Sequence, residues 1–137
     1  MAIITLTTDL GTKDGYLASV KGSIYSQLEN AKIVDITNNI ELFNIQQAAF
    51  VLQNCFKDFP VGTVHIVSVD DELSLSNEHI AVKAHGHFFI GADNGLFSLL
   101  FNTLKVDKIV RLNISLTTNC MTFATKNIFA QAACHLA

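Results

Sequence analysis

Two carboxylates lie close together near the start of the chain, in residues 7–16. The stretch reads Thr-Thr-Asp-Leu-Gly-Thr-Lys-Asp-Gly-Tyr, with Asp9 and Asp14 as its acidic residues. An apolar, β-rich run precedes it and a helical spacing follows it, so it is predicted to join a strand to a helix. Ligands of open α/β sheets bind at the carboxyl ends of strands, which makes Asp9 a candidate binding residue. The spacing alone also fits a plainer alternative, in which both carboxylates accept hydrogen bonds from turn and helix N-terminal N–H groups.

Further hydrogen-bond acceptors follow other predicted strands. Asp70 closes an apolar run, and Asp93 and Asn94 lie in a glycine-flanked turn after the next one. Acceptors gathered at one sheet edge suit a polyhydroxylated ligand, because carboxylates accept hydrogen bonds from the neighbouring hydroxyls of a ribose. A divalent cation is the alternative, since Mg²⁺ prefers carboxylates. The chain has neither DxD nor DxDxDG spacing, so no metal site is predicted.

Other catalytic motifs are absent or weak. The sequence has no GxGxxG, Walker or GxSxG pattern, which argues against dinucleotide binding, P-loop chemistry and a serine hydrolase. His85 and His87 have the spacing of a two-ligand site, but they lie at a predicted hairpin tip without a third ligand, and we predict solvated turn histidines. His65, inside a predicted buried strand, is expected to be a hydrogen-bonded core residue.

The composition is that of a compact domain. Of the 137 residues, 50% are hydrophobic and 15% charged, and the net charge is −3 with no basic cluster, which argues against nucleic-acid binding. Apolar runs stay below the ~18–20 residues of a membrane span, and no signal peptide is evident. The cysteines lack CxxC spacing and are expected to be inert reduced thiols of a cytoplasmic protein; they are Cys55, Cys120 and Cys134.

The order of elements predicts an α/β fold, with a mixed, mostly parallel sheet and helices on both faces. Thr12 is the expected N-cap of the first helix and Asn44 that of the second, where Gln47 completes a capping box and Phe43 a hydrophobic staple. A hairpin is expected around His85 and Gly86. The predicted strands are 2–8, 31–36, 63–69, 80–83, 88–90 and 106–112, and the predicted helices are 13–29, 45–56, 96–104 and 125–137.

Six segments in register resemble one family, the S-adenosyl-L-methionine (SAM) hydroxide adenosyltransferases, which are related to the bacterial fluorinase and chlorinase. The similar segments are 7–16, 31–37, 44–52, 59–70, 91–96 and 128–137. The resemblance implies that residues 1–137 form the family's N-terminal α/β domain. That domain would be incomplete at its C-terminus, and the family's C-terminal β-barrel would be absent.

The resemblance also implies an activity. Family members are cytoplasmic and cleave SAM to adenosine and methionine by attack of water on the ribose C5′, with SAM as substrate and no cofactor or metal. Asp9 would hold the ribose hydroxyls, Phe43 would form a wall beside the ribose, and Asp70 would hold the water. Asp14 and Thr125 would lie beside the site, and the retained Asp93 and Asn94 favour an adenosyl ligand. Members assemble as trimers, so a homo-oligomer is expected, with no nucleic-acid or membrane partner.

The chain departs from the family at two positions of the water-positioning triad. Asp70 matches the aspartate, but Asn77 stands at the arginine position and Ala124 at the histidine position. Asparagine cannot replace a guanidinium, and alanine cannot act as a general base. A degenerate member that binds an adenosyl ligand or serves as a structural subunit is therefore the alternative function. Halogenation is not expected, because the carboxylate of Asp70 would repel a halide.

Overall fold

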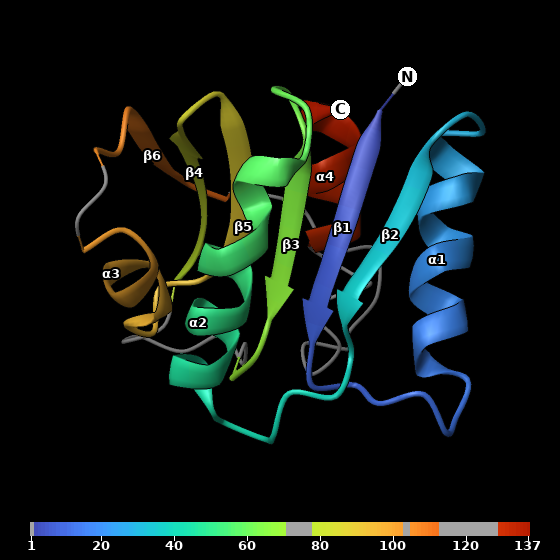
Figure 1. Cartoon of the computed structure of the whole chain (residues 1–137). Coiled ribbons are helices and arrows are strands. Elements are labelled where there is room, and N and C mark those ends of the chain that lie inside the picture. The colour runs from blue at the N-terminus through green and yellow to red at the C-terminus, as the bar shows by residue number, and fades with distance from the viewer. Residues whose placement is uncertain (1, 71–77, 103–104, 113–128) are drawn as a thin grey trace.

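A six-stranded mixed sheet forms the centre of the molecule (Figure 1). The computed structural model describes residues 2–70, 78–102, 105–112 and 129–137. The strand order is β2-β1-β3-β5-β4-β6. The strands are β1 (Ile3–Thr8), β2 (Lys32–Thr37), β3 (Val64–Ser68), β4 (His79–Ala84), β5 (His87–Ala92) and β6 (Lys108–Arg111). The helices are α1 (Tyr16–Gln27), α2 (Ile45–Cys55), the 3₁₀ turn η1 (Phe56–Asp58), α3 (Leu96–Leu100) and α4 (Ala130–Leu136).

Strands β2, β1, β3 and β5 run parallel, and β4 is antiparallel to both β5 and β6. The carboxyl ends of the four parallel strands therefore meet at one edge of the sheet, at the bottom of Figure 1. Helices α2 and α3 cover one face, and α1 and α4 cover the other. The predicted α/β class, with a mixed sheet and helices on both faces, is confirmed.

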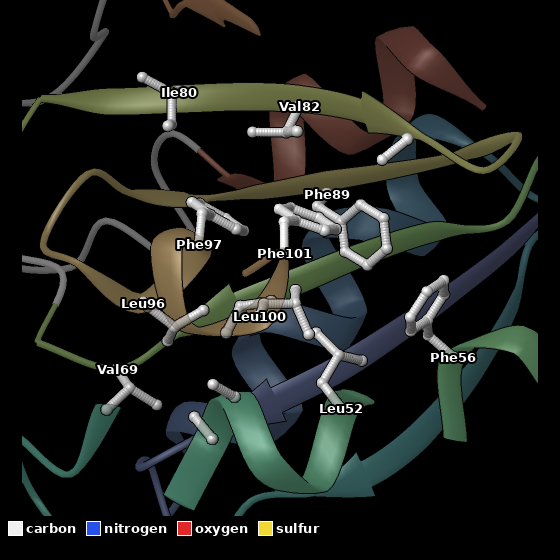
Figure 2. Close-up of a cluster of buried hydrophobic side chains, with 14 of the residues drawn as sticks. Leu52, Phe56, Val69, Ile80, Val82, Phe89, Leu96, Phe97, Leu100 and Phe101 are labelled. Carbon is white, nitrogen blue, oxygen red and sulfur yellow. The ribbon is translucent and has the colours of Figure 1, made fainter. Parts of the chain in front are cut away.

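Each face of the sheet has its own apolar core. On the α2 and α3 side, aromatic and aliphatic side chains pack between the helices and strands β3, β4 and β5 (Figure 2). Phe89 lies at the centre of this cluster, with ring centroids 5.2 Å from Phe56 and 5.0 Å from Phe101. On the other face, Ile4 and Leu6 of β1 pack with side chains of α1 and α4. Strand β3 is buried along its whole length, which explains its mostly apolar sequence.

Helix α1 begins later than predicted. It starts at Tyr16 with Gly15 as N-cap, rather than at residue 13 with Thr12 as cap. The Asp14 carboxylate accepts a hydrogen bond from the Tyr16 N–H at 3.2 Å, so this side chain serves the first turn in place of Thr12. Gly11 has a φ of +75°, and the bends at residues 12–15 that follow this left-handed position include residues that the periodicity assigned to the helix.

Helix α2 begins where it was predicted to begin. The Asn44 side chain accepts a hydrogen bond from the Gln47 N–H at 3.0 Å, which confirms the cap. The Gln47 side chain accepts from the Glu41 N–H at 3.1 Å. In the predicted capping box it would accept from the Asn44 N–H instead. The predicted staple is wrong, because Phe43 is 71% exposed and has a positive φ of 64°.

The hairpin between β4 and β5 is confirmed, but one of its histidines is not solvated. His85 and Gly86 form the turn with positive φ angles, and His85 is exposed as expected. His87 is buried, and its Nδ1 lies 3.1 Å from Nε2 of His65. Nδ1 of His65 lies 2.7 Å from Oγ1 of Thr5. The core role predicted for His65 is thus confirmed, whereas His87 belongs to β5 and faces the same core.

The buried His65 should make folding stability depend on pH. Burial, and secondarily the neighbouring His87, lowers the pKa of His65 from 6.5 to about 3. The unfolded chain takes up a proton below pH 6.5 and the folded chain does not until about pH 3, so the stability conferred above pH 6.5 is lost as the pH falls through this window. We expect a loss of roughly 2 kcal/mol between pH 6.5 and 5, at about 1.36 kcal/mol per pH unit.

Urea unfolding at a series of pH values measures this dependence. The variant His65→Leu removes the titrating group and should flatten the slope, while His135→Gln, at an exposed position, should leave it unchanged. An equal slope in wild type and His65→Leu would show that other groups cause the pH dependence.

Candidate active site at the carboxyl edge of the sheet

Asp9 and Asp70 follow neighbouring parallel strands. Thr8 pairs with Ser68 in the register of β1 and β3, and the Asp9 N–H donates to the Ser68 carbonyl at 3.3 Å. Both aspartates are half-buried. Asp9 therefore follows the last paired residue of β1 directly, and Asp70 lies two residues after the last paired residue of β3. The sequence-based expectation that Asp9 and Asp70 lie at one sheet edge is confirmed, while their roles remain predictions.

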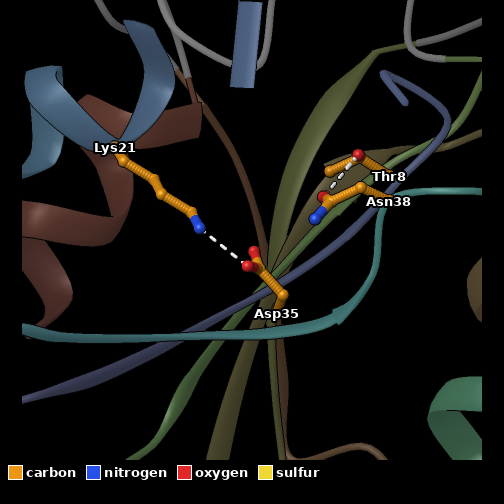
Figure 3. Close-up of polar contacts among 4 residues, drawn as sticks. All are labelled: Thr8, Lys21, Asp35 and Asn38. Carbon is orange, nitrogen blue, oxygen red and sulfur yellow. Dashed lines mark hydrogen bonds and ion pairs between the residues drawn. The ribbon is translucent and has the colours of Figure 1, made fainter. Parts of the chain in front are cut away.

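Hydrogen bonds of Thr8 and Asn38 join the loops after β1 and β2. Neither residue was predicted from the sequence to belong to the site. Thr8 Oγ1 donates to the Asn38 side-chain oxygen at 2.8 Å, and both residues are buried (Figure 3). The Gly11 N–H donates to the Asn38 carbonyl at 2.6 Å, and the Ile40 N–H to the Thr8 carbonyl at 3.2 Å. These bonds fix the backbone on both sides of Asp9. The available signal was a polar residue at the end of each of two adjacent parallel strands.

Asp14 and Phe43 lie in the loops that follow β1 and β2. Asp14 is exposed and bonds the Tyr16 N–H, which is the plain helix-terminal role weighed from the sequence. Phe43 presents its ring to solvent just before α2. An exposed aromatic ring beside a row of strand ends provides an apolar surface on which a ligand can pack.

Asp93 and Asn94 follow β5 and differ in how their side chains are used. Asp93 is exposed, and its N–H donates to the Glu78 carbonyl at 2.6 Å. Asn94 is half-buried, and its side-chain amide donates to the carbonyls of Val69 at 2.9 Å and Asp70 at 2.8 Å. The turn after β5 is therefore tied to the turn after β3.

The edge carries a concentration of negative charge. Asp9, Asp14, Asp70 and Asp93 all lie in its loops, and Glu78 beside them pairs with Arg111 at 3.0 Å. Such a row of carboxylates attracts a cationic ligand and repels anions. Within the described ranges, no three His, Cys, Asp or Glu side chains are grouped to hold a metal ion.

Some predicted positions cannot be placed. Thr125, together with Asn77 and Ala124 at the two departures from the family, lies outside the described residues.

His79 is buried at the start of β4, paired with Ala92, and its ring packs edge-on against Phe129 at 4.9 Å.

Two cysteines lie in the described ranges, each in a helix. Cys55 and Cys134 are half-buried, and burial raises the pKa of both thiols. A raised pKa disfavours the nucleophilic thiolate. Each helix in the described part of the chain is too short or too polar to cross a membrane.

Comparison with known proteins identifies the class to which this fold and edge belong. Residues 4–137 match the model of the SAM hydroxide adenosyltransferase N-terminal domain. The chain belongs to this family.

Individual relatives agree with the family match. The chain is 34% identical, over 133 residues, to the (R)-S-adenosyl-L-methionine hydrolase of Methanocaldococcus jannaschii, covering 93% of this chain and 50% of that one. It is 28% identical over 81 residues to a fluorinase of Actinopolyspora mzabensis, covering 59% and 27%. A Thermotoga maritima crystal structure superposes with a TM-score of 0.90 at 32% identity, covering 97% and 53%. The chain thus spans about half the length of the curated relatives it matches.

Proposed function

We propose that the protein containing this chain hydrolyses S-adenosyl-L-methionine to adenosine and L-methionine at the carboxyl edge of the sheet. The observation that carries the proposal is the placement of Asp9 and Asp70 at adjacent strand ends, in a chain of this family. The names of the relatives support the substrate and the reaction. Neither a metal nor a cofactor is part of the proposal.

Each residue has a role that follows from its chemistry. Asp9 accepts hydrogen bonds from the two ribose hydroxyls, which a carboxylate does well because it has two acceptor oxygens. Phe43 packs against the ribose, and Asp14 and Asp93 lie beside the bound ligand. The acidic edge attracts the positively charged sulfonium. Thr125 is proposed to lie beside the bound ligand.

The reaction needs alignment more than activation of the leaving group. Asp70 accepts a hydrogen bond from a water molecule and orients its oxygen toward C5′. A C5′–O bond forms as the C5′–S bond breaks, the electron pair passes to sulfur to give the neutral thioether of methionine, and a proton is released. Holding the attacking oxygen, carbon and sulfur in line removes much of the entropic barrier.

Binding without turnover is the second candidate function, and one observation favours it. Asn77 and Ala124 stand where the family resemblance implies the arginine and histidine of a water-positioning triad. The sequence therefore retains the proposed ribose carboxylate and lacks two groups that would act on the water.

Incubation with SAM in H₂¹⁸O separates the two functions. Hydrolysis predicts adenosine and methionine in equal amounts, with one ¹⁸O in the adenosine 5′-hydroxyl, faster than the spontaneous decay of SAM. Saturable SAM binding without adenosine would support the second function and exclude the first. Formation of a 5′-halogenated adenosine on adding chloride or fluoride would show that halide, rather than water, is the nucleophile.

The proposal also includes the assembly and location of the protein. We propose a cytoplasmic homotrimer, which the family resemblance supports. Leu42 and Phe43 are each at least 69% exposed, and such apolar side chains favour burial against another subunit. Light scattering of the purified protein tests the assembly, and a monomeric mass at micromolar concentration would contradict it.

A further inference from the structure

The backbone of Asp70 has an unusual conformation. Its φ is +51°, in the left-handed region that residues other than glycine rarely adopt. Asparagine and aspartate tolerate this region better than other residues do, but they persist there only where the surroundings hold them. Left-handed backbone directly after a strand turns the chain sharply, so the direction of the Asp70 side chain depends on what holds this turn.

The amide of Asn94 holds it. The side-chain nitrogen of Asn94 donates to the carbonyls of Val69 at 2.9 Å and Asp70 at 2.8 Å, and so reaches from the end of β5 to the end of β3. The side-chain oxygen of Asn94 accepts from the Leu96 N–H at 3.1 Å, at the start of α3. An asparagine amide has two N–H groups, and both are used within the chain.

We propose that Asn94 is a positioning residue, which fixes the left-handed turn at Asp70 and thereby aims the Asp70 carboxylate at the attacking water. This inference rests on the proposed hydrolysis. It also replaces the sequence-based expectation that Asn94 binds substrate directly, because its donors are engaged by Val69 and Asp70. Asn94 acts through Asp70, so its loss should impair the reaction more than it impairs binding.

Two substitutions separate this role from the capping of α3. Asn94→Asp keeps an oxygen for the Leu96 N–H but removes both donors to the β3 turn. Asn94→Ala removes the donors without adding charge, so an effect that both variants share cannot come from the new carboxylate. Asn44→Ala is the matched control, since it removes an asparagine cap from a different helix, α2, where the side chain of Asn44 accepts from the Gln47 N–H.

The variants are compared by adenosine release from SAM, by calorimetric binding of adenosine, and by the crystal structure of Asn94→Ala. We expect both Asn94 variants to lower kcat by about 10- to 100-fold and to leave the Kd of adenosine within about twofold. Asn44→Ala should leave kcat within about twofold. The φ of Asp70 should leave the positive region in Asn94→Ala. A crystal of Asn94→Asp serves the same purpose if Asn94→Ala does not fold.

Three results would overturn the proposal: an unchanged kcat in both Asn94 variants, an equal fall of kcat in Asn44→Ala, or an unchanged Asp70 backbone in the variant crystal. Failure of the proposed function is a separate result, namely no adenosine from the wild type. In that case the crystal structure alone decides whether Asn94 positions Asp70.

Discussion

Replacing Asp70 by asparagine should slow adenosine formation by about 100- to 1,000-fold. The change removes the negative charge that accepts a hydrogen bond from the attacking water, and general-base and water-orienting groups contribute effects of this size. Asparagine tolerates the left-handed backbone of Asp70, so the turn after β3 should keep its shape. Adenosine release from SAM, measured over a range of concentrations, gives kcat and KM for both proteins.

The control for this prediction is Asp58→Asn, which makes the same change of charge at the opposite end of the sheet, before β3. It should leave kcat within about twofold, and the Kd of adenosine should be the same in Asp70→Asn as in wild type. A kcat in Asp70→Asn within threefold of wild type would show that Asp70 does not act on the water.

Replacing Phe89 by alanine should cost about 3–5 kcal/mol of folding stability. Phe89 is fully buried, stacks on His65 at 4.9 Å, and makes edge contacts with Phe56 and Phe101 (Figure 2). Its removal opens a cavity between the sheet and its helices, and a rigid core relaxes only partly into such a space. Urea unfolding followed by far-UV circular dichroism gives the free energy of unfolding.

Phe50→Ala is the matched control, because Phe50 lies on the outer side of α2 and is 66% exposed. We expect this variant to change stability by less than about 0.5 kcal/mol. A cost below about 1.5 kcal/mol for Phe89→Ala would mean that the core around β5 repacks freely.

The strands and the hairpin could be predicted because local sequence patterns and the final structure agree there. Strand β3 is buried on both faces, so its sequence is mostly apolar, and the His85–Gly86 turn matches the twist of the hairpin. The start of α1 was predicted less well. Thr12 was a sound cap by residue type, but the left-handed turn at Gly11 and its bond to Asn38 carry the chain past it.

The part of the candidate site that depends only on the direction of the strands could be predicted from the sequence. Because parallel strands end at one edge, Asp9 and Asp70 could be placed together from the sequence. The role of Asn94 could not be predicted, since its bonds depend on how the turns after β3 and β5 approach each other. The burial of His87 was missed for a similar reason, as its partner His65 comes from a strand 22 residues earlier.

The body of the sheet and its carboxyl edge are stabilised by different interactions, which explains why one was predicted better than the other. The body of the sheet is mostly apolar on both faces, which the sequence pattern reveals, whereas the edge is held by hydrogen bonds between distant turns. Thr8 and Asn38 fix the backbone around Asp9, and Asn94 fixes that around Asp70. A rigid sheet thus presents two carboxylates from loops whose conformations are set by neighbouring strands.

The most direct test of the central claim is whether Asp9 binds the ribose hydroxyls of an adenosyl ligand. Calorimetry should be carried out on wild type and Asp9→Ala with two ligands, adenosine and 2′,3′-dideoxyadenosine. We predict that Asp9→Ala weakens adenosine binding by about 10- to 100-fold, as expected for lost hydrogen bonds to a charged acceptor, and leaves the weak dideoxyadenosine binding unchanged. Equal affinities of wild type and Asp9→Ala for adenosine would contradict the account.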